Sequence, residues 1–89
     1  MQQVHKEKMI LKAFAKVLSD ERSKINKSQR IFAFENDLHK SMISRFESCS
    51  SEPKLFSIWK LANALGLKPS QFFDLIENEL PEDFSYLVD

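Results

Sequence analysis

The sequence predicts an all-α fold, and three observations support this. The chain of 89 residues has one Gly and three Pro, so few residues interrupt helices. Glu, Lys, Leu, Ala, Gln and Ser are abundant, and most of these favour helix. No segment alternates apolar and polar residues for long enough to indicate a sheet. The length corresponds to one domain with a small core, and we expect a compact bundle of five helices.

The first two helices are predicted from an apolar stripe and a capping residue. The first helix is expected over about residues 7–24. Its stripe, near period 3.6, consists of Met9, Ile10, Phe14, Val17, Leu18 and Ile25. Ser28 is a good N-cap for a second helix over about 29–35, which should bury Ile31 or Phe32 together with Ala33. Asn36 and Asp37 tolerate the left-handed conformation and should end it.

Three further helices follow with clear start and stop residues. The third is expected over about 39–48, with an apolar face of Leu38, Met42, Ile43 and Phe46. Pro53 precedes a fourth helix over about 54–65, and Gly66 should terminate it. The apolar side of that helix is Leu55, Ile58, Leu61, Ala62 and Leu65. A fifth helix should start near Pro69 and carry Phe72, Phe73 and Ile76.

Charge is distributed unevenly although the net charge is zero. All 13 Lys and Arg lie before residue 69, and six acids with no base follow it. A basic body permits a polyanionic partner, although ordinary solvated surfaces would look the same. Cys49 is the only cysteine, which excludes a disulfide framework and favours a reducing, cytoplasmic compartment. No apolar run approaches the ~20 residues of a membrane span.

The second and third helices are short, and a turn of only a few residues joins them. This spacing is typical of a helix-turn-helix, whose second helix can lie in the DNA major groove. In the stretch "DLHKSMISRFE" (37–47), the apolar face would fix the helix to the domain. The other face would present groups able to contact bases and phosphates.

Two stretches together resemble a known family. "SQRIFAFENDLHKSMISRFE" (28–47) is similar to the helix-turn-helix of the phage-repressor, Cro-like family, also called the xenobiotic-response-element family. "EPKLFSIWKLANALGLKPSQFF" (52–73) resembles the two helices that follow it there. The resemblance covers about residues 9–78. It implies a lambda-repressor-like DNA-binding bundle, with residues 1–78 as the helix-turn-helix domain and 79–89 as an acidic, apolar C-terminal tail.

The resemblance also implies a DNA interface. Gln29 matches a residue that usually contacts a phosphate, and a helix N-terminus favours an anion there. Lys40 and Arg45 could donate to guanine or equally to phosphate, and His39 could instead cap its helix. Glu47 is interpreted as structural. The residues expected to contact DNA are Gln29, Arg30, His39, Lys40, Ser41, Ser44, Arg45 and Lys54.

Two departures from the family pattern concern the turn and the loop after the third helix. Asp37 and Cys49 stand where the family often has Gly, and the loop 48–52 contains no basic residue. Phosphate contacts supply much of the affinity for DNA, so we expect modest affinity unless two copies bind together. Lys27, Arg30 and Lys54 would partly compensate.

Oligomeric state and partners are predicted from apolar residues outside the expected core. Phe34, Phe56 and Trp59 would either be covered by the first helix and the tail or form a subunit interface. A tail residue, Phe84 or Tyr86, packed over Trp59 would favour the first. We expect a homodimer through the fourth and fifth helices and the tail, binding double-stranded DNA.

The predicted function is therefore a sequence-specific transcriptional regulator, repressor-like and encoded by a bacterium or phage. The alternative is an antitoxin or adaptor-type protein-interaction module, in which the tail binds a protein partner. No catalytic residue pair is evident, so no enzyme activity is expected. Neither a cofactor nor a metal site is expected, because His5 and His39 are far apart and lack a nearby carboxylate cluster. Cys49 has no partner His for nucleophilic catalysis.

Overall fold

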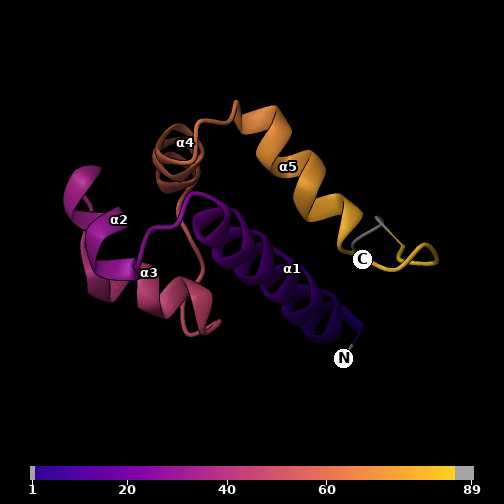
Figure 1. Ribbon diagram of the computed structural model, residues 1–89. Helices are drawn as coiled ribbons and strands as arrows, with labels where there is room; N and C mark the ends of the chain where they lie inside the picture. The colour runs from indigo at the N-terminus through magenta and orange to yellow at the C-terminus, as the bar shows by residue number, and fades with distance from the viewer. Residues whose placement is uncertain (1, 86–89) are drawn as a thin grey trace.

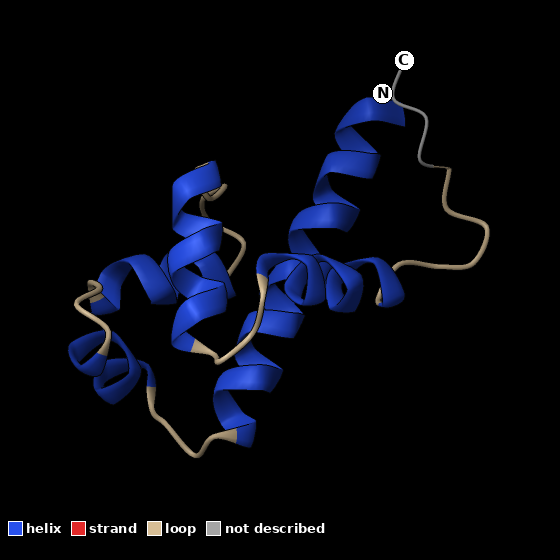
Figure 2. Cartoon of the chain, turned by 90° about the horizontal axis from the view of Figure 1, so that it is seen from above, coloured by secondary structure: helices blue, strands red, loops and turns tan. Residues whose placement is uncertain are grey.

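The computed structural model describes residues 2–85, and within them the chain forms five α-helices and no strand (Figures 1 and 2). The helices are α1 (Gln2–Lys24), α2 (Gln29–Glu35), α3 (Lys40–Glu47), α4 (Leu55–Ala64) and α5 (Pro69–Asn78). α1 packs against α3 and α5, α2 packs on α3, and α4 packs on α5. The long α1 therefore joins the α2–α3 pair on one side to α5 on the other (Figure 1). The predicted all-helical fold class is confirmed at this level.

All five helices contribute to a single hydrophobic core. Leu18, Phe32, Ile43, Leu61 and Phe72 are completely buried, one from each helix. No polar or charged side chain among the described residues is fully buried. The core therefore orients the helices relative to one another and leaves the polar faces outside.

Local capping explains why the short helix α2 begins at Gln29. Ser28 has an extended backbone, and its Oγ accepts a hydrogen bond from the backbone N–H of Ile31 at 3.1 Å. This satisfies one of the N–H groups that a helix start leaves without a partner. The predicted N-cap is confirmed, and of the two alternatives for the buried face, Phe32 is buried whereas Ile31 is 38% exposed.

The hydrogen bond of the Ser28 cap should contribute measurably to the stability of the domain. Replacing Ser28 with Ala should lower the free energy of unfolding by about 1 kcal/mol, because the Ile31 N–H loses its acceptor. Urea denaturation followed by circular dichroism measures this. Ser70, which is exposed in the first turn of α5, provides the matched control: Ser70→Ala should change stability by less than about 0.5 kcal/mol. Equal effects of the two substitutions would contradict the capping role.

Residues with positive φ separate the helices where the sequence predicted breaks. Asp37 has φ 55° between α2 and α3, and Gly66 has φ 75° after α4. Cys49, which stands where the family often has Gly, also has a positive φ of 63°. Asn36 behaves differently: its φ is −114°, and its side-chain Nδ2 donates to the carbonyl of Phe32 at 2.8 Å. Asp37 alone therefore makes the left-handed step of this turn.

Three sequence expectations differ from the structure. α1 begins at Gln2 rather than near residue 7. No Gly or Pro precedes Met9, the first residue of the predicted stripe, and adding residues to an existing helix is favourable. Ile25, assigned to the apolar stripe, lies beyond α1 and is 40% exposed. Leu55, assigned to the buried side of α4, is 67% exposed. Leu55 is the first residue of α4. The periodic pattern places it on the apolar face, but the pattern cannot tell whether another element covers that end of the helix.

The chain after α5 turns back toward the body of the molecule. Leu80 packs against the core, and Phe84 is half-buried. Phe84 lines a groove of about 710 Å³ together with Ile10, Phe73 and Leu80, among others. Tyr86, the other tail residue considered as a cover for Trp59, lies outside the described residues. None of the helices in the described part of the chain is long and apolar enough to cross a membrane.

Candidate nucleic-acid interface

The turn between α2 and α3 is built so that one face of α3 is anchored. The backbone N–H of Leu38 donates to the carbonyl of Ala33 in α2 at 2.8 Å. Leu38, Ile43 and Phe46 are buried, and Met42 packs against them. The Phe46 ring meets the Phe14 ring of α1 edge to face, with centroids 5.6 Å apart. The predicted apolar face of α3 is thus confirmed as the face that holds this helix to the domain.

The opposite face of α3 is open to solvent. His39, Lys40, Ser41 and Arg45 are exposed, and Ser44 is half-buried. His39 occupies the N-cap position, but its side chain makes no capping hydrogen bond. Among residues 2–85, no carboxylate lies within ion-pair distance of Lys40 or Arg45. Both cations are therefore accessible to an external anion.

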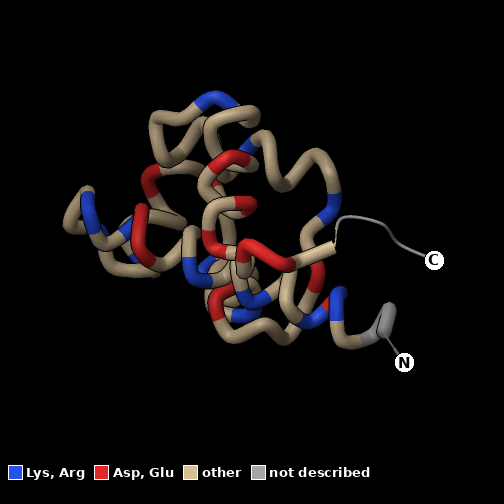
Figure 3. Tube along the Cα trace, turned by 90° about the vertical axis from the view of Figure 1, so that its right-hand side faces the viewer, with Lys and Arg blue, Asp and Glu red and all other residues tan. Residues whose placement is uncertain are grey.

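The basic residues outside α3 differ in whether they already form ion pairs within the protein. Figure 3 shows Lys and Arg spread over several sides of the molecule rather than confined to one element. Arg30 in α2 and Lys54, the N-cap of α4, are exposed, and neither forms an ion pair with a described carboxylate. Lys27, in contrast, pairs with Glu35 at 2.9 Å. Of the three residues expected to compensate for the base-poor loop, Lys27 therefore already has a carboxylate partner.

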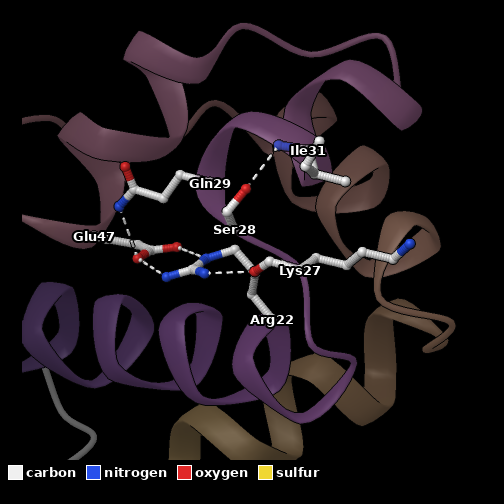
Figure 4. A network of polar contacts seen from close by, with 6 residues as sticks. All are labelled: Arg22, Lys27, Ser28, Gln29, Ile31 and Glu47. Atoms are coloured by element: carbon white, nitrogen blue, oxygen red, sulfur yellow. Dashed lines mark hydrogen bonds and ion pairs between the residues drawn. The ribbon is translucent and has the colours of Figure 1, made fainter.

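Glu47, the last residue of α3, joins three elements (Figure 4). Its Oε2 accepts from Arg22 Nε, and its Oε1 accepts from Arg22 Nη2, each at 2.8 Å. The Arg22 Nη1 also donates to the carbonyl of Lys27 at 2.7 Å, which fixes the connection between α1 and α2. The side chains of Arg22 and Glu47 are only 13% and 8% exposed. These contacts confirm that Glu47 supports the fold.

The ion pair also shifts the titration of its cation. The hydrogen bonds that the Arg22 guanidinium donates to Glu47 raise its pKa above the ordinary value, while partial burial lowers it. Arginine is already charged at every physiological pH. Arg22 therefore keeps its positive charge beside Glu47 at every physiological pH.

Gln29, the first residue of α2, belongs to the same network. It is half-buried, and its side-chain Nε2 donates to Glu47 Oε1 at 3.0 Å. The structure thus brings Gln29 to the end of α3, although it was predicted only as a phosphate contact. Arg22 was not predicted as the partner of Glu47. A buried acid needs a cation, but nothing local in the sequence distinguished Arg22 from the other basic residues of α1.

Three large apolar residues left outside the core lie together on α4. Leu55, Phe56 and Trp59 are 67%, 74% and 45% exposed. The ammonium of Lys60 lies 5.9 Å from the centre of the Phe56 ring, and Phe34 of α2 is 83% exposed. Of the two alternatives for Phe34, Phe56 and Trp59, coverage by α1 and the described part of the tail is therefore not found, and the subunit interface stays a prediction. Among residues 2–85, no group of three or more His, Cys, Asp or Glu is arranged so that it could hold a metal ion.

Comparison with known proteins gives one informative relative. No family model matches the chain. Over 52 residues the chain is 42% identical to control protein C.BamHI of Bacillus amyloliquefaciens. The aligned region is 58% of this chain and spans 64% of the length of that relative. By sequence, the chain is thus similar to a bacterial control protein over more than half of its length.

Proposed function

We propose that this protein is a sequence-specific double-stranded DNA-binding regulator of transcription, repressor-like, with α2 and α3 as its helix-turn-helix. The carrying observation is the two-sided character of α3. Its buried side fixes it to the core, while Lys40 and Arg45 on the other side are exposed and unpaired within the described chain. An α-helix fits the major groove of B-DNA. The similarity to a control protein supports the same function, and no catalytic step is part of it.

The proposal divides the contacting residues by role. The side chains at the start of α3, His39, Lys40 and Ser41, and one turn later Ser44 and Arg45, are placed to read bases. Gln29, Arg30 and Lys54 lie at helix starts outside α3 and are assigned to the sugar-phosphate backbone. Two copies acting together would contact two half-sites about one helical turn apart. The exposed apolar side of α4 supports this dimer, because such patches on soluble proteins mark interaction sites.

Selection of bound sites from a random pool of duplex DNA tests the function directly. A palindromic consensus is expected, since a two-fold symmetric dimer binds a two-fold symmetric site. A selected sequence without a repeat would show specific binding by a single copy. Absence of any enriched sequence, together with no salt-sensitive binding to duplex DNA, would contradict the proposal.

Two substitutions separate base reading from phosphate contact. Arg45→Ala should lower the affinity for the selected site by about 1–3 kcal/mol and relax specificity at one position. Lys54→Ala should weaken binding about equally for specific and random duplex and reduce the salt slope by about 1. Titrations of both duplexes at several salt concentrations measure these effects. If Arg45→Ala binds both duplexes as the unchanged protein does while remaining folded, Arg45 is not part of the interface.

The second candidate function is a protein-interaction module of the antitoxin or adaptor type. The loop 48–52 between α3 and α4 has no base and one acid, which favours this candidate over strong DNA binding. The acidic tail after Asn78 would then contact a protein partner. A variant truncated after Asn78 distinguishes the two functions: DNA binding should persist in a regulator, apart from the stability that Leu80 and Phe84 contribute through their packing.

A further inference from the structure

We infer that Arg22, which lies outside the DNA-contacting set, is a positioning residue for DNA binding because it neutralises Glu47 next to the phosphate-contacting side chain of Gln29. This inference rests on the proposed function. It assigns to the Arg22–Glu47 pair an effect on the charge of the interface, in addition to its contribution to the fold.

The hydrogen bond to Glu47 fixes the orientation of the Gln29 amide. A carboxylate only accepts hydrogen bonds, so the Gln29 group facing Glu47 must be the NH₂, as the 3.0 Å contact shows. In Figure 4 the amide oxygen of Gln29 points away from Glu47. One N–H of the amide is thus used by Glu47, and the second N–H is the only side-chain donor left for a phosphate.

A negative charge lies beside that donor. Glu47 Oε1 is 3.0 Å from Gln29 Nε2, so a phosphate held by the second N–H would lie close to a carboxylate. The phosphate and the Glu47 carboxylate are both negative and would repel each other, and a partly buried site screens this repulsion less than bulk water does. The repulsion is removed only if a cation compensates Glu47. Arg22 supplies it through two hydrogen bonds of 2.8 Å.

Arg22 also fixes the position of Glu47 relative to Gln29. Glu47 Oε1 accepts from both Arg22 and Gln29, and Arg22 also holds the carbonyl of Lys27, two residues before Gln29. A single guanidinium therefore ties the end of α1 to the start of α2 and the end of α3. Without it, the carboxylate would be free to take both N–H groups of Gln29 or to turn toward the DNA.

Two substitutions with opposite expected effects test the inference, using the full chain and a random-sequence duplex at 50 and 300 mM salt. Arg22→Met should weaken binding at the lower salt by on the order of 10-fold, because Glu47 is left uncompensated. Glu47→Gln keeps an acceptor for Gln29 but removes the negative charge, so binding at the lower salt should tighten by roughly 3-fold or more. Both differences should shrink at the higher salt.

The opposite signs distinguish positioning and neutralisation from a purely structural role. Loss of structure can only weaken binding, so tighter binding by Glu47→Gln has no structural explanation. Circular dichroism at the temperature of the titration establishes that each variant is folded. If Arg22→Met does not fold, Glu47→Gln alone decides. Unchanged or weaker binding by folded Glu47→Gln would overturn the inference, whereas failure of the unchanged protein to bind duplex DNA would refute the proposed function instead.

Discussion

Replacing Phe14 with alanine is expected to lower the free energy of unfolding by about 3–5 kcal/mol, the usual cost of removing a buried aromatic side chain. Phe14 is 4% exposed. Its ring meets Phe46 of α3 edge to face, with centroids 5.6 Å apart, and Phe72 of α5 with centroids 6.0 Å apart. Removing it therefore weakens both interfaces that α1 makes with the rest of the bundle.

This loss is large compared with the total stability of a small domain, which is about 5–15 kcal/mol. Urea denaturation monitored by circular dichroism, with linear extrapolation to water, measures it. The matched control is Phe34→Ala, because Phe34 is 83% exposed and its loss should cost less than about 0.5 kcal/mol. Similar midpoints for the two variants would show that the three-ring contact does not stabilise the fold.

The helices could be predicted from sequence because each is bounded by residues with a local role. Ser28 caps α2, Asp37 makes the turn to α3, and Gly66 and Pro69 separate α4 from α5. Such signals act over a few residues and need no knowledge of the fold. Leu55 was assigned wrongly because burial depends on what covers a residue, and Leu55 itself is left 67% exposed although Ile58 of the same face packs against the core.

The candidate site was predictable to a smaller extent. The polarity of the two faces of α3 follows from its sequence, and the structure confirms which face is buried. The partners of Glu47 do not follow from it: Arg22 is 25 residues away and Gln29 is 18 residues away. Contacts over such separations exist only once α1, α2 and α3 are packed. DNA contact by the individual side chains remains a prediction.

Replacing Phe56 with glutamate is expected to convert the proposed dimer to a monomer and so reduce affinity for a palindromic site by on the order of 10²–10⁴-fold. Phe56 is 74% exposed between Leu55 and Trp59 on one side of α4. A two-fold interface places each copy of this patch opposite the other. Two carboxylates introduced near the axis would have to be desolvated close together, which opposes association.

Sedimentation velocity measures the oligomeric state, and titration of full-site and half-site duplexes measures binding. Phe56→Glu should bind a half-site as the unchanged protein does, because its α3 surface is unaltered, and lose only the gain from the second half-site. Arg45→Ala should behave in the opposite way: it should stay dimeric and bind both duplexes more weakly. A Phe56→Glu protein that remains dimeric would place the subunit contact elsewhere. The groove lined by Ile10, Phe73 and Phe84 would then be the next surface to substitute, because it is another apolar surface of the described residues.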